Sequence, residues 1–185
     1  LYQGDFVETG AEGAVGITFV DDSTFSLAED ARVTLDELVY DAGSETGSLK
    51  ATLVQGVFSF ISGSIAKTDP DAMTINTPTA VIGIRGTAAG GGVDGNGVTT
   101  VALLPEAESF AGEMNISNDA GTQTINEPGQ AVNIASTDAP PSAPFVMTPQ
   151  QMGMAFGSAL GALPNAGSAL GQGVVEGAEE GQAQQ

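Results

Sequence analysis

The sequence predicts an all-β fold followed by one short helix, on three observations. The chain holds 26 glycines and 9 prolines in 185 residues, and these two residue types interrupt long helices. Hydrophobic residues make up 41% of the chain, which is enough to fill a core. Apolar residues also alternate at period two in a series of short segments, as in half-buried strands. We therefore expect residues 1–136 to form a compact β-sandwich or a short β-solenoid.

The first two strands are predicted to form a hairpin. Residues 14–20 and 24–27 both alternate between apolar and small or polar side chains, and an Asp-Asp-Ser turn at residues 21–23 separates them. The alternation continues through Val33, Leu35 and Leu38, and residues 41–48 are expected to form a polar loop.

The next predicted strand is long, covering residues 51–61. Its apolar positions change phase around Gly56, because Leu53 and Val57 precede Phe58 and Phe60. A glycine at such a position predicts a β-bulge or a sharp bend.

Six further strands are predicted, and Pro78 separates the first two. Residues 90–92 are all glycine and residues 94–97 are Asp-Gly-Asn-Gly, so we expect a flexible tip there. The six strands are residues 73–77, 79–84, 98–104, 114–117, 122–125 and 131–134.

The composition changes after residue 136. Residues 137–148 are rich in proline and predict an extended linker. A helix is predicted over residues 149–163, because Thr148 can cap it, Pro149 suits the first helical position and Gln151 completes a capping box. Residues 164–185 predict a flexible acidic and glutamine-rich tail, in which residues 167–171 repeat the Gly-Ser-Ala-Leu-Gly sequence of residues 157–161.

The predicted helix combines an apolar stripe with glycines at spacing four. Each glycine weakens a helix by about 1 kcal/mol relative to alanine, so this helix needs external packing. Its apolar stretch is too short to cross a bilayer. We therefore expect it to be an interaction arm whose contact residues are Met152, Gly153, Phe156, Gly157, Leu160, Gly161 and Leu163.

Composition argues against several classes of function. The chain has neither histidine nor cysteine, which removes the usual general base, thiol nucleophiles and thiolate metal sites. Its 4 Lys and Arg against 23 Asp and Glu give a net charge of −19, which disfavours nucleic-acid binding. We expect no enzymatic activity, no catalytic residues and no cofactor.

Calcium is the one ligand that the acidic residues could bind. The candidates are Asp21, Asp22, Asp94 and Asn96, which carry the oxygen ligands that Ca²⁺ prefers. These residues lack a complete calcium-binding motif, so turn and capping roles are favoured.

The most distinctive motif is the stretch from Thr77 to Thr87. Together with residues 4–10, 16–19, 55–58 and 127–132, in that order along the chain, it resembles the FecR-domain family. The resemblance covers about residues 1–135 and implies an extracytoplasmic all-β domain. The motif residues are Thr77, Pro78, Thr79, Ala80, Val81, Gly83, Arg85, Gly86 and Thr87.

Arg85 is the unusual residue of this motif, because it lies between Gly83 and Gly86 on a predicted strand. We expect a buried or half-buried arginine satisfied by backbone carbonyls or by an aspartate such as Asp5 or Asp22. The alternative is a ligand-binding arginine, whose planar guanidinium suits a carboxylate.

Two functions follow from these observations. The first is a secreted or cell-surface structural protein that binds a protein partner or copies of itself, and that the arm assembles into filaments. The second is a periplasmic signal-relay domain, because many FecR-like proteins relay a signal from an outer-membrane transporter to a sigma factor. The chain begins at Leu1 without an initiator methionine, so we expect a mature form or a fragment.

Overall fold

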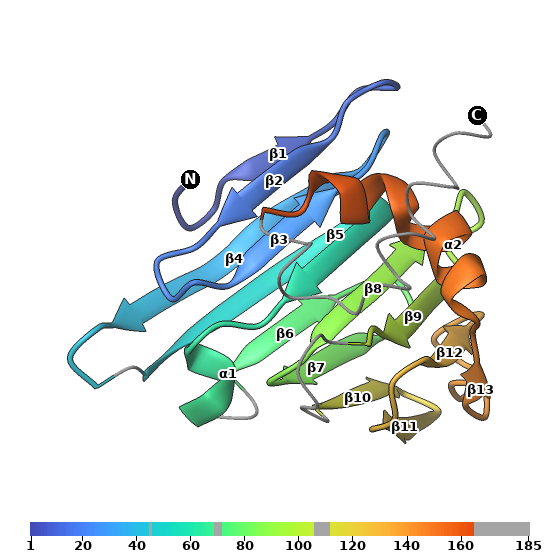
Figure 1. The fold of residues 1–185 in the computed structure, drawn as a ribbon. Coiled ribbons are helices and arrows are strands. Elements are labelled where there is room, and N and C mark those ends of the chain that lie inside the picture. The colour runs from blue at the N-terminus through green and yellow to red at the C-terminus, as the bar shows by residue number, and fades with distance from the viewer. Residues whose placement is uncertain (45, 69–71, 106–111, 165–185) are drawn as a thin grey trace.

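The computed structural model describes residues 1–44, 46–68, 72–105 and 112–164. These residues form an all-β fold with one longer helix near the C-terminal end, which confirms the predicted fold class (Figure 1). The elements in order are β1 Phe6–Glu8, β2 Val15–Thr18, β3 Thr24–Leu27, β4 Arg32–Asp41, β5 Thr46–Ile61, α1 Ile65–Thr68, β6 Met73–Asn76, β7 Val81–Arg85, β8 Ala88–Val93, β9 Thr99–Leu103, β10 Glu113–Asn118, β11 Gly121–Ile125, β12 Gln130–Ile134, β13 Phe145–Val146 and α2 Pro149–Ala162.

The long strand β5 belongs to two sheets that together form one curled sheet (Figure 1). Its first half pairs with β4 and, in parallel, with β6. Its second half pairs with β3 and β8. Sheet A therefore has the order β1-β4-β5-β6-β7-β10-β11, and sheet B has the order β2-β3-β5-β8-β9-β12-β13.

The bend predicted at Gly56 lies where β5 passes from one sheet to the other. Gly56 has a φ of +94°, which favours glycine, and a Cβ there would collide with the backbone of Ala31. The β4–β5 register also shifts beside it, since Arg32 pairs with Gln55 and Val33 with Leu53. This bulge and bend reverse which side chains of β5 face the core, from Leu53 before the bend to Phe58 after it.

The main core lies between the inward faces of the two sheets. Its centre is aromatic: the Phe25 and Phe58 rings stack with centroids 5.7 Å apart, and Phe60 lies 6.2 Å from Phe25. All three side chains are buried. The apolar alternation that predicted these strands therefore identified the core side of β3 and of the second half of β5.

The prediction of a flexible tip at residues 90–92 was wrong. These glycines lie inside β8, between β5 and β9. A Cβ at Gly90 would be 2.8 Å from a ring carbon of Phe156, and one at Gly91 would be 2.5 Å from a ring carbon of Phe58. The glycines therefore make room for an aromatic ring on each face of the sheet.

Several pairings were not predicted. The polar loop expected at residues 41–48 is shorter than predicted, because β4 and β5 pair as far as Asp41 and Thr46 and so extend the strands into it. The proline-rich residues 137–148 lie along the sheet: β13 pairs with β12, and Asn118 Nδ2 donates hydrogen bonds to the Ser136 and Ala139 carbonyls at 3.0 and 2.7 Å. Of the predicted tail, residues 165–185 lie outside the described residues.

We expect Gly56→Ala to destabilise the fold by about 2–4 kcal/mol, through left-handed backbone strain and overpacking against Ala31. The matched control is Gly83→Ala, because the nearest atom to a Cβ at Gly83 is 3.8 Å away. Denaturant unfolding of both variants measures the difference. An equal loss of stability in the two variants would contradict the role assigned to Gly56.

Candidate functional site

The family-like motif begins with a closed turn between β6 and β7. The Thr77 amide donates to the Ala80 carbonyl at 2.8 Å, and the Ala80 amide donates to Thr77 Oγ1 at 3.1 Å. The Thr79 and Thr99 hydroxyls lie 2.6 Å apart, and Thr99 Oγ1 also donates to Thr77 Oγ1. Because Thr99 belongs to β9, these hydroxyls join the motif of sheet A to sheet B.

The end of the motif makes the second connection between the sheets. Gly86 has a φ of +56°, and the chain passes there from β7 in sheet A to β8 in sheet B. The Thr87 side chain is buried against Gly112, where a Cβ would collide with it. Both ends of the motif therefore fix the relation between the two sheets.

Between these ends, β7 alternates between core and solvent. Ile82 and Ile84 are buried, whereas Val81, Gly83 and Arg85 face outward. Gly83 is directly opposite Thr74 of β6 and Asn115 of β10. Further pairs of this kind continue the line of directly opposite residues across six strands. We name this line of residues the polar row: Glu37, Lys50, Thr74, Gly83, Asn115 and Thr124.

Arg85 is half-buried, as predicted, and one of its partners is a residue that was not predicted, Glu113. Its Nη1 donates to Glu113 Oε1 at 3.1 Å, with 38% of its side chain exposed. Glu113 Oε1 also accepts from Asn115 Nδ2, and Asn115 Oδ1 accepts from Thr124. Cross-strand pairing between β7 and β10 brings Arg85 and Glu113 together, although they are 28 positions apart in the sequence.

Other cations of sheet A are also paired with carboxylates. Arg32 Nε lies 2.7 Å from Glu8 Oε1, and Lys50 Nζ lies 2.7 Å from Glu37 Oε2. The hydrogen bond from Lys50, together with one from Ser48, holds the pKa of Glu37 below its ordinary value of 4.5. That the chain does not bind nucleic acid stays a prediction. The pairing of these cations with carboxylates is consistent with it, because their charges are already neutralised.

The calcium candidates have structural partners. The buried Asp21 carboxylate accepts from the Ser23 hydroxyl at 2.6 Å and from the Ile65 amide at 3.4 Å, so it joins the β2–β3 turn to α1. Asp94 Oδ1 accepts from the amides of Asn96 and Val98 and closes the β8–β9 turn. Asp22 occupies the same turn as Asp21, with a φ of +65°. Within the described residues, no three acidic side chains form a group that could hold a metal ion, and calcium binding stays a prediction.

Helix α2 lies on the outer face of sheet B, where it contacts β2, β3, β5 and β8 (Figure 1). Thr148 and Gln151 form the predicted capping box at its start. Of the predicted arm residues, Gly161 is exposed and the other six are buried: Met152, Gly153, Phe156, Gly157, Leu160 and Leu163. Burial stabilises by about 1.5–3 kcal/mol per large apolar side chain, which offsets the helix glycines.

The floor beneath α2 is made of small residues, and we name it the helix groove: Gly16, Ser26, Ser59, Ala88, Gly90 and Ala102. A Cβ at Gly16 would collide with the Ala162 carbonyl, and Gly90 accommodates the Phe156 ring. Ser26 Oγ donates to the Ala159 carbonyl at 2.7 Å. Sequence reasoning missed this groove, because its residues lie on five strands and carry no distinctive side chain.

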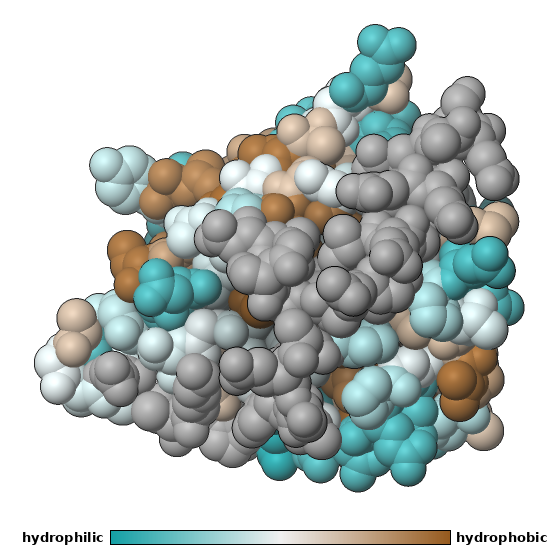
Figure 2. Space-filling view, viewed as in Figure 1, coloured by the Kyte–Doolittle hydropathy of each residue, from teal (hydrophilic) through white to brown (hydrophobic). Residues whose placement is uncertain are grey.

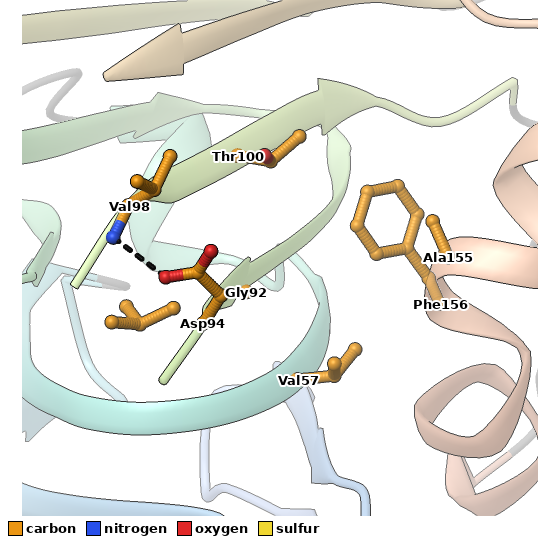
Figure 3. Close-up of a pocket in the computed structure, with 8 residues that line it drawn as sticks. Val57, Gly92, Asp94, Val98, Thr100, Ala155 and Phe156 are labelled. Atoms are coloured by element: carbon orange, nitrogen blue, oxygen red, sulfur yellow. Dashed lines mark hydrogen bonds between the residues drawn. The ribbon is translucent and has the colours of Figure 1, made fainter. Parts of the chain in front are cut away.

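A pocket of about 220 Å³ lies beside the helix groove, at Ala155 and Phe156 of α2. Figure 3 shows Phe156 and Ala155 on one side of it, facing the strands that carry Val57, Gly92 and Thr100. Most of its lining is apolar. Elsewhere on the surface, apolar residues are exposed over β1 and β13 (Figure 2), including Phe6 and Val146.

Comparison with known families gives a match to the model described as FecR protein, over residues 5–106. The chain belongs to the FecR family. This match contains the motif of β7. It also contains all five strands that form the floor of the helix groove, which are β2, β3, β5, β8 and β9. The family prediction made from the Thr77–Thr87 motif is therefore confirmed.

Two similar solved structures, at 2.50 and 1.65 Å resolution, are of a "putative anti-sigma factor" from Parabacteroides distasonis. Their TM-scores are 0.57 and 0.54, each at 10% identity and over 77% of this chain. At this identity the likeness concerns the fold alone. The chain spans 59% of the length of each of these structures. No curated protein matches the chain.

These findings overturn the prediction of a filament-forming structural protein. The family match favours the alternative that the sequence left open, a signal-relay domain. The physical reason lies in α2, because Met152, Phe156 and Leu160 are at most 3% exposed against the chain's own sheet. The apolar face that was expected to bind another copy is already covered. Among the described residues, none of the helices has the length and apolarity needed to span a membrane.

Two serines of the helix groove allow a matched test of its packing. Ser26→Ala removes the hydrogen bond to the Ala159 carbonyl and should destabilise the protein by about 1 kcal/mol. Ser59 Oγ is buried without a hydrogen-bond partner among the described residues, so Ser59→Ala should be neutral or stabilising. Denaturant unfolding compares the two, and a larger loss at Ser59 would contradict this geometry.

The lowered pKa of Glu37 predicts a pH dependence of stability. Lys50 and Ser48 stabilise the ionised form of Glu37 in the folded protein. The contribution of Glu37 to the free energy of unfolding is therefore complete above the ordinary pKa of 4.5, and it disappears as pH falls through the lowered pKa of the folded state. The difference in unfolding free energy between the wild type and Glu37→Gln should therefore shrink as pH falls from 6 to 3. Lys50→Met should show the same trend, and a difference independent of pH would contradict it.

Proposed function

We propose that this chain is an extracytoplasmic, non-catalytic domain that binds a protein partner and relays a signal to a sigma factor. Its membership of the FecR family carries the proposal. The similarity of its fold to structures described as an anti-sigma factor supports it. The absence of histidine and cysteine from the sequence supports a binding function rather than a catalytic one.

The polar row around Gly83 is the surface that we assign to the partner. The core does not require glycine at position 83, because a Cβ there would meet its nearest atom at 3.8 Å. The Arg85–Glu113 ion pair is half-exposed, and such pairs contribute at most about 1 kcal/mol to stability. Gly83 and Arg85, which face outward on β7, therefore contribute little to the stability of the fold. They leave a polar face with a flat centre, suited to contact with another protein.

Deleting the full-length gene should change the transcription of genes that depend on one sigma factor, measured by transcript profiling. Complementation with the wild type should restore the profile, and the Gly83→Arg variant should fail to restore it, because its side chain would stand in the centre of the polar row. The matched control is Gly95→Arg in the β8–β9 turn, where a Cβ has no atom within 4 Å.

Both variants should unfold at the wild-type temperature when purified, which separates loss of binding from loss of fold. An unchanged transcript profile after gene deletion would overturn the proposed function. Full activity of Gly83→Arg would reject the polar row as the contact surface.

A further inference from the structure

We propose that the helix groove of sheet B is a binding site for a helix of a partner protein, and that α2 is a displaceable occupant of this groove. The inference rests on the proposed function, because a relay domain needs two arrangements that a partner can bias. In one arrangement α2 covers the groove, and in the other the partner's helix replaces it.

The groove has the shape of a helix-binding site. Gly16 lets a helix backbone approach the sheet, Gly90 leaves a hole that an aromatic ring fills, and Ser26 donates to a helix carbonyl. Its floor strands β2, β3, β5 and β8 fall within residues 5–106, which match the FecR family, whereas α2 lies outside this range. The groove thus belongs to the family domain, and its present cover is supplied from beyond it.

Ser59 shows that α2 does not complete the groove. The register places Ser59 between Ser26 and Gly90, and α2 meets these two neighbours at Ala159 and Phe156. Ser59 Oγ nevertheless remains buried without a hydrogen-bond partner among the described residues. A buried hydroxyl in this state is unfavourable. A helix with a hydrogen-bonding side chain at this point would satisfy it.

This geometry defines the chemistry of the partner. It is an amphipathic helix with small residues on its groove face, an aromatic side chain to enter the hole at Gly90, and a polar side chain within one turn of it to reach Ser59. The pocket between Phe156 and the β8–β9 strands lies open beside the groove, so an incoming helix can make its first contacts there (Figure 3).

Helix α2 is suited to displacement because its helical state depends on docking. It has 14 residues and contains Gly153, Gly157 and Gly161, and isolated helices of this length are marginal even without glycine. Detachment from the groove and unfolding of the helix therefore occur together, as one local transition.

The first test measures opening of the groove in the full chain. The chain has no cysteine, so Ser59→Cys places a single thiol on the groove floor. Ala89→Cys is the matched control, on the adjacent strand β8 but facing the main core. If α2 detaches locally, we expect a thiol reagent to label the Ser59→Cys protein roughly 100-fold faster than the control. Equal labelling rates would overturn the proposal.

The second test measures occupancy by a helix supplied in trans. The probe is a fluorescent peptide with the sequence of residues 148–164, and fluorescence anisotropy should show that it binds the full chain. The same peptide with Phe156→Ala should bind at least about 10-fold more weakly, because it cannot fill the hole at Gly90.

A disulfide that holds α2 in the groove tests whether the peptide binds by displacing this helix. In Ser26→Cys/Ala159→Cys, a disulfide across the contact between these two residues should abolish peptide binding, and reduction should restore it. Peptide binding that persists with the disulfide formed would overturn the proposal, as would a peptide that does not bind the wild type. A doubling of mass by light scattering under labelling conditions would also overturn it, because a second copy would then be the occupant.

Failure of these tests is distinguishable from failure of the proposed function. They use the purified chain without a sigma factor, so equal labelling rates would leave signal relay intact. Conversely, an unchanged transcript profile after gene deletion would reject the relay function while the peptide still exchanged with α2.

Discussion

The bend in β5 at Gly56 is the constraint on which the other features of the structure depend. A single strand supplies hydrogen bonds to β4 and β6 before the bend and to β3 and β8 after it. The left-handed φ of Gly56 and its contact with Ala31 set the angle between the two halves. That angle decides where the two sheets enclose the core, and therefore how the polar row and the helix groove are placed.

The same strand also connects the two surfaces. Lys50, before the bend, contributes to the polar row, whereas Val57, just after it, lines the pocket beside α2. The hydroxyl contacts of Thr99 with Thr77 and Thr79 are a second connection between the sheets. Coupling between sites requires an element with two arrangements. The structure offers α2 as that element, since β5 and the threonine cluster are fixed by buried packing.

Period-two alternation predicted the strands well where one face is buried and the partner strand is near in sequence, as for β3 and for the second half of β5. It failed where distant residues decide the structure. Glycines 90–92 resemble a flexible tip in the sequence, but Phe58 and Phe156 occupy the space beside them. The partner of Arg85 was missed for the same reason, because strand pairing brings Glu113 to it. The family motif was recognisable because its residues are contiguous.

The error about α2 shows what a sequence of this kind leaves undetermined. An amphipathic helix weakened by glycines must pack against another surface, but its own residues do not distinguish a surface of the same chain from one of another molecule. Here Gly16, Ser26 and Gly90 decide the question, because their small side chains let the helix dock on its own sheet. Docking covers the apolar face that a filament would need. The buried Ser59 hydroxyl, which has no hydrogen-bond partner among the described residues, shows that this docking is incomplete. That incompleteness is what makes an exchange of helices physically reasonable.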